Sequence, residues 1–90
     1  MKVRYAPAAR EHLRVLFNYI ALRNETAALA VFIAIHTMTN RLSSFPYLGH
    51  ATVAKEVYEI VVPGLQYVIA YKINEKEIII LGIYHGKQSR

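Results

Sequence analysis

The spacing of the apolar residues changes once along this chain, and that change limits the folds open to it. Between residues 13 and 42 the apolar side chains recur every three or four positions, as they do on one face of a helix. After the turn-forming segment 43–49, SSFPYLG, the pattern becomes runs of β-branched and aromatic residues. The chain is therefore predicted to place a helical half before a β-rich half, which is typical of an α+β fold.

Two helices are predicted, over residues 7–23 and 24–42. Pro7 suits the first turn of a helix because its missing N–H costs nothing there, and Asn24 can cap the second helix. The connection between them is too short for anything but an antiparallel hairpin. The side chains expected to pack this hairpin onto a sheet are Leu13, Phe17, Ile20, Val31, Ile35 and Leu42.

Four strands are predicted, over residues 2–5, 55–62, 67–73 and 78–84. Pro63 and Gly64 form a natural centre for a type II turn between two of them. The segment 78–84 is apolar on both faces and is expected to be central. The prediction is a single domain over residues 1–90 with the order β-α-α-β-β-β, in which the helix hairpin covers one face of a small antiparallel sheet.

Length and composition restrict the class of protein. Ninety residues, 54% of them hydrophobic, suffice for one modest core. The chain has no cysteine, which excludes disulfides and cysteine-based zinc sites, and no apolar run approaches the roughly 20 residues of a membrane span. The first five residues, MKVRY, lack the layout of a signal peptide. We therefore expect a cytoplasmic protein with no membrane association.

The charge favours an anionic partner. Eleven Lys and Arg residues against six Glu residues give a net charge of +5. In so small a domain this excess suits nucleic acid or an acidic polypeptide. The alternative interpretation is that the charge only keeps the protein soluble.

The sequence contains no motif of a known catalytic or phosphate-binding site. Glu56 and Glu59 are expected on opposite faces of a strand, so they do not form a pair of carboxylates. His12 and His36 have no second ligand at metal-binding spacing, and we predict neither a metal nor a cofactor. His85 differs, because it ends the most apolar strand and precedes a basic tail, where it could act as an acid or a base.

Basic and aromatic residues cluster in the β-rich half. Lys55 and Lys72 are expected on neighbouring strands, with Tyr71 beside them and with Lys87 and Arg90 in the tail. Such a surface could hold a phosphate backbone and stack on bases, so these five residues are the candidate target- or nucleic-acid-binding set. The alternative is that the tyrosine packs against its neighbours while the lysines lie at a solvated rim.

Seven segments, in this order and spacing, resemble the RelE/ParE superfamily of toxins from type II toxin–antitoxin loci, often described as plasmid stabilization proteins. They are AAREHL at 8–13, NYI at 18–20, FPYLG at 45–49, KEV at 55–57, VVPG at 61–64, YVIAY at 67–71 and ILGIYHG at 80–86. The resemblance covers nearly the whole chain. It implies a growth-arresting toxin that a cognate antitoxin neutralises in a hetero-oligomer, through a segment that folds across the groove and sheet edge of the toxin.

The resemblance leaves the target open between two branches. RelE-like members cut messenger RNA on the ribosome without a metal, which would make His85, Lys55, Lys87 and Arg90 the candidate catalytic residues. ParE-like members poison DNA gyrase and need no hydrolytic site. The ribonucleases commonly carry an arginine where this chain has Val68, so the ParE-like branch is favoured. A third alternative is a degenerate, non-toxic binding module.

Overall fold

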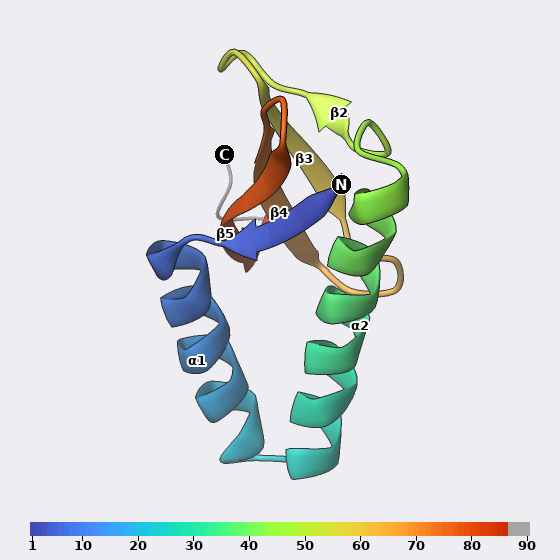
Figure 1. Ribbon diagram of the computed structural model, residues 1–90. Coiled ribbons are helices and arrows are strands. Elements are labelled where there is room, and N and C mark those ends of the chain that lie inside the picture. Colours follow the sequence, from blue (N-terminus) through green and yellow to red (C-terminus); the bar gives the residue numbers. More distant parts are fainter. Residues whose placement is uncertain (87–90) are drawn as a thin grey trace.

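The computed structural model describes residues 1–86 and confirms the α+β architecture (Figure 1). Two helices form a hairpin that packs on a five-stranded sheet. The elements are β1 (Lys2–Tyr5), α1 (Pro7–Ala21), α2 (Glu25–Ser44), β2 (His50–Ala51), β3 (Val57–Val61), β4 (Tyr67–Ile73) and β5 (Glu77–His85).

The ends of both helices follow the local signals in the sequence. α1 begins at Pro7 as predicted, although it ends at Ala21, two residues before the predicted end. Asn24 caps α2, because its side-chain oxygen accepts a hydrogen bond of 3.0 Å from the backbone N–H of Ala27. Residues 22–24 are all that connects the helices, so they run antiparallel, and their connection points away from the sheet (Figure 1). Neither helix combines the length and apolar character needed to cross a membrane.

The sheet is mixed rather than antiparallel, which corrects the prediction. Its strand order is β1-β5-β4-β3-β2, and β5 lies between β1 and β4, a central position as expected. β3, β4 and β5 are joined by short turns, which force them to be antiparallel. β1 pairs with β5 in parallel. No turn joins these two strands, so their relative direction is set by how the helix hairpin packs.

The turn after β3 forms where the sequence predicts it, but the start of β3 differs from the prediction. Gly64 has a φ of 76°, and the backbone N–H of Leu65 donates to the carbonyl of Val62, as a turn centred on Pro63-Gly64 requires. The strand predicted from residue 55 starts at Val57, so Lys55 lies in the turn before it. No periodic signal marks β2, since two residues are too few to show a pattern.

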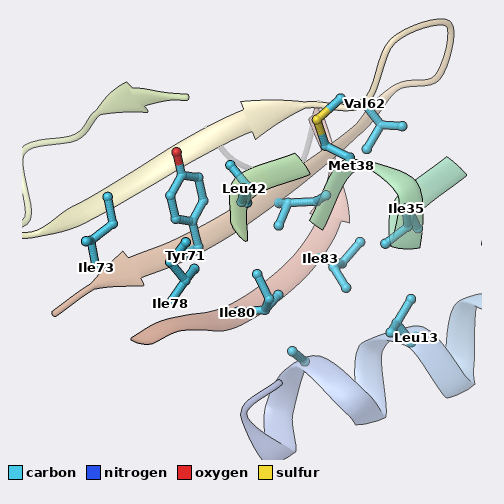
Figure 2. Packing of buried hydrophobic residues seen from close by; sticks show 12 residues of the cluster. Leu13, Ile35, Met38, Leu42, Val62, Tyr71, Ile73, Ile78, Ile80 and Ile83 are labelled. Carbon is cyan, nitrogen blue, oxygen red and sulfur yellow. The ribbon is translucent and has the colours of Figure 1, made fainter. Parts of the chain in front are cut away.

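The core lies between the hairpin and the sheet. Figure 2 shows Ile35, Met38 and Leu42 of α2 and Leu13 of α1 around Tyr71 and the isoleucines of β4 and β5. Among the predicted core residues, Leu13, Ile35 and Leu42 are buried and Val31 packs partly buried against them.

The prediction was wrong for Phe17 and Ile20, which are only half-buried. The hairpin extends beyond the sheet, so apolar side chains in its outer half have no strand to pack against (Figure 1). The rings of Phe17 and Phe32 instead pack edge to face, with 6.1 Å between centroids.

Candidate functional site

The register of the sheet places the predicted basic residues far from His85. Lys72 of β4 lies opposite Val57, and Lys55 is in the turn just before Val57. His85 lies opposite Tyr67, at the other end of β4. From Tyr67 to Lys72 the strand rises by about 17 Å at about 3.3 Å per residue. Lys55 and His85 therefore do not form one catalytic centre within the domain.

The other two predicted cations, Lys87 and Arg90, lie outside the described residues. Within residues 1–86, no group of three His, Asp or Glu side chains lies close enough together to hold a metal ion.

Tyr71 was expected to contact a target, and its position corrects that prediction. The residue is 0% exposed and belongs to the core. Its hydroxyl donates to the carbonyl of Pro46 at 2.9 Å and accepts from the backbone N–H of Gly49 at 3.0 Å. Burial raises the pKa of this phenol, which keeps it protonated and able to donate. Tyr71 thus fastens the loop 45–49 to the sheet and offers no surface for stacking.

Gly49 is required where it stands in this loop. A Cβ atom added there would lie 2.5 Å from the carbonyl oxygen of Glu59 and 2.7 Å from the Tyr71 hydroxyl. The close approach of loop and strand therefore depends on glycine.

His85 borders a hollow of about 550 Å³ between α1 and one end of the sheet. Its ring stands perpendicular to that of Tyr67, with 5.8 Å between centroids. The hollow is lined by His12, Val15, Leu16, Tyr19, Tyr67, Ile83, Tyr84 and His85. His12 has a structural function, because its Nδ1 accepts a hydrogen bond of 3.1 Å from the backbone N–H of Ile83.

A polar cluster that the sequence did not indicate joins β2, β3 and β5. The hydroxyl of Tyr84 donates a short hydrogen bond to the carboxylate of Glu59, whose other oxygen lies 3.9 Å from Nε2 of His50. Partial burial and the neighbouring carboxylate raise the pKa of Tyr84 to about 12. The cluster is hard to predict because its members are distant in sequence and only the strand register brings them together.

A second hollow is an apolar groove of about 610 Å³ between the two helices, which we call the interhelical groove. It is lined by Tyr5 of β1, by Arg10, Leu13, Arg14, Phe17 and Asn18 of α1, and by Leu29, Phe32 and His36 of α2. Phe32 is 39% exposed and Leu29 is 51% exposed, and the two lie next to each other in one apolar hollow. The walls of the groove are therefore apolar surface that residues 1–86 do not cover.

Two arginines give the groove a positive rim on the α1 side. Arg14 forms an ion pair with Glu11 one turn earlier. Arg10 donates only to the carbonyl of Tyr5, at 3.4 Å, and no carboxylate among residues 1–86 pairs with it. The groove consequently combines an apolar floor with an uncompensated cation.

At one end of the groove, Tyr5, His36 and Thr39 form a hydrogen-bonded cluster. The Tyr5 hydroxyl lies 2.6 Å from Thr39 Oγ1 and 3.2 Å from His36 Nδ1. The Thr39 hydroxyl donates to the backbone carbonyl of His36 at 3.0 Å. The His36 ring also packs on Phe32, with 4.3 Å between centroids. Burial lowers the pKa of His36, so its imidazole is neutral at pH 7.

The interhelical groove was not anticipated from the sequence, although a signal for it exists. Leu29, Phe32 and Ile33 lie outside the single stripe that a sheet-facing helix needs, so α2 has apolar residues on more than one face. A second apolar stripe is typical of a helix that meets another surface besides its own core.

Comparisons with known proteins identify a family and a solved structure of the same fold. Residues 3–90 match the model of the family described as "ParE toxin of type II toxin-antitoxin system, parDE". A solved structure titled "Chromosomal ParDE TA system from P. aeruginosa" contains a chain of the same fold, with a TM-score of 0.82 and 19% sequence identity. The match covers 94% of this chain and 95% of that one. Comparison with curated proteins gives no match.

Proposed function

Because the match over residues 3–90 shows that the chain belongs to the ParE toxin family of type II toxin–antitoxin systems, we propose that it arrests bacterial growth by poisoning DNA gyrase. We propose also that a cognate antitoxin holds it inactive by occupying the interhelical groove.

The separation of Lys55 and Lys72 from His85 is the observation that favours gyrase poisoning over messenger RNA cleavage. A metal-free ribonuclease needs an acid or base and a phosphate-binding cation around one scissile bond. Among the described residues, Lys72 lies about 17 Å along β4 from the level of His85, and Lys55 lies beyond Lys72 in the turn before β3. The position beside Tyr67 is occupied by Val68, an apolar and buried side chain. A gyrase poison acts by binding and does not need such a centre.

The groove supplies the surface on which an antitoxin would bind. Its exposed leucine and phenylalanine side chains suit the apolar face of an amphipathic helix, and Arg10 at the rim suits acidic residues beside that face. The net charge of +5 on the toxin favours an acidic partner over a basic one. The solved relative is itself part of a ParDE toxin–antitoxin system.

The first test measures gyrase inhibition and cleavage of messenger RNA with the purified toxin. We expect it to inhibit supercoiling by gyrase and to cause cleaved DNA to accumulate, while ribosome-bound message stays whole. His85→Ala should change gyrase inhibition only in degree, because the histidine would contribute surface and not acid–base chemistry. The matched control is His50→Ala, which changes a histidine on the edge strand β2.

Two results would overturn the proposal. One is cleavage of messenger RNA within ribosome-bound codons while gyrase is unaffected. The other is a loss of toxicity on the order of 10²–10⁴ in His85→Ala alone, which is the size expected for a general acid or base. Normal growth at good expression of folded toxin would support the degenerate binding module instead.

A further inference from the structure

The hydrogen bonds at the end of the interhelical groove fix the tautomer of His36. One assignment of the protons makes all three contacts hydrogen bonds at once: the Thr39 hydroxyl donates to the carbonyl of His36, and Tyr5 donates to Thr39 Oγ1. The only donor left for the contact between Tyr5 Oη and His36 Nδ1 is the imidazole itself. The proton of the neutral ring is therefore on Nδ1, and Nε2 carries a lone pair.

Among the described residues, nothing uses this lone pair. No group among residues 1–86 donates a hydrogen bond to Nε2, and the described part of the chain has no buried side-chain nitrogen left without a partner, so Nε2 is reached by solvent. His36 lines the groove, between the ring of Phe32 and Tyr5. The groove thus holds a hydrogen-bond acceptor in a wall that is otherwise apolar on the α2 side.

We propose that His36 Nε2 selects the register of the antitoxin helix, by accepting a hydrogen bond from a polar donor placed within the apolar face of that helix. This inference rests on the proposed function, since it assumes that the antitoxin occupies the groove. A helix that covered Nε2 with apolar atoms would leave the acceptor buried without a partner, which disfavours every register but one. The polar residue at a single core position of coiled coils sets register by the same physics.

The proposal makes neutralisation of the toxin depend on pH. Protonation of Nε2 turns the acceptor into a donor, and the cation would face Arg10 and Arg14 on α1, with Tyr5 on β1 as the remaining titratable neighbour. Antitoxin affinity should therefore be full while His36 is neutral and should fall as the pH drops through the pKa of His36. Burial places that pKa below its ordinary value of 6.5, and a bound helix that donates to Nε2 lowers it further.

The experiment measures the affinity of the toxin for the antitoxin encoded beside it, from about pH 8 to about pH 5, with wild type, His36→Phe and His50→Phe. His36→Phe keeps a ring against Phe32 and removes the acceptor. We expect it to bind about tenfold more weakly than wild type near neutral pH, the effect of one lost hydrogen bond, and to lose most of the fall in affinity at low pH. His50→Phe, which lies outside the groove, should retain the wild-type affinity and the wild-type pH dependence.

An NMR titration of His36 in the free toxin, followed in the complex, gives a second measurement that does not depend on a variant. The pKa of His36 should decrease when the antitoxin binds. An unchanged or increased pKa, or equal pH dependence of wild type and His36→Phe, would overturn the proposal. If Leu29→Ala also leaves antitoxin affinity unchanged, then the assignment of the groove itself is wrong, which separates the failure of the proposed function from the failure of this inference.

Discussion

At the scale of single residues, Tyr84 and Glu59 show how strand register creates a polar pair that neither residue indicates alone. Both side chains lie on the face of the sheet opposite to Ile69 and Tyr71, which face the helices. The phenol donates to the carboxylate, and partial burial together with the negative charge of Glu59 makes loss of the phenol proton unfavourable. The pair therefore ties β5 to β3 across β4 for as long as Tyr84 is protonated.

The pair predicts a change in stability at alkaline pH. The pKa of Tyr84 is raised to about 12 in the folded protein, against an unfolded value of 10.0. Its contribution to stability should be fully present below about pH 10 and lost as the pH rises through about 12. Glu59→Gln removes the charge, so a spectrophotometric titration of the tyrosines should show the pKa of Tyr84 moving down toward its ordinary value. An unchanged titration curve in Glu59→Gln would mean that burial alone raises the pKa.

At the scale of elements, His12 joins α1 to the part of β5 that β1 does not reach. β1 pairs with β5 only as far as Ile80, so the backbone N–H of Ile83 has no strand on that side. His12 Nδ1 accepts this hydrogen bond, and its ring lies 3.1 Å from the position of a Cβ on Gly82. The helix thus replaces a strand at the edge of the sheet, and glycine at position 82 leaves room for the ring.

His12→Leu should destabilise the fold, because it leaves the buried N–H of Ile83 without an acceptor. The expected loss is about 1–3 kcal/mol in the free energy of unfolding, measured by urea denaturation. His50→Leu, an exposed histidine, should change stability by less than about 0.5 kcal/mol. Equal stabilities for the two variants would contradict a structural function of His12.

At the scale of the whole molecule, the helix hairpin is longer than the sheet that it covers. The molecule extends 40 Å along its longest axis against 24 Å along its shortest, and the connection of the helices lies far from the strands (Figure 1). The inner half of the hairpin completes the core, and the outer half exposes apolar side chains. Stability and partner binding should therefore depend on different residues of the same helix.

Two leucines of α2 test this division with the same substitution. Leu42→Ala, in the core, should cost about 2–5 kcal/mol in the free energy of unfolding. Leu29→Ala, in the wall of the groove, should change stability by less than about 0.5 kcal/mol. It should weaken antitoxin binding by roughly fivefold, the equivalent of about 1 kcal/mol, because the truncated side chain would otherwise be covered by the antitoxin. Calorimetric titration and thermal unfolding of both variants check the two quantities separately, and similar stability losses would contradict the division.

What the sequence determines by itself is local. Pro7 and Asn24 fix the start of each helix, and Pro63-Gly64 fixes a turn, because each acts through its own backbone or its nearest neighbours. The apolar period of residues 13–42 and the β-branched runs after residue 54 determine the α+β class for the same reason. The order and spacing of the segments led to the RelE/ParE superfamily, and the match to the ParE family confirmed it.

Only the tertiary structure decided which residues meet. The parallel pairing of β1 with β5, the distance between Lys55 and His85, and the burial of Tyr71 all follow from register and from the packing of the hairpin. These depend on contacts between residues distant in sequence, which no local pattern encodes. The interhelical groove belongs to the same class, since an apolar side chain on a helix has the same sequence signal whether its own core or a partner covers it.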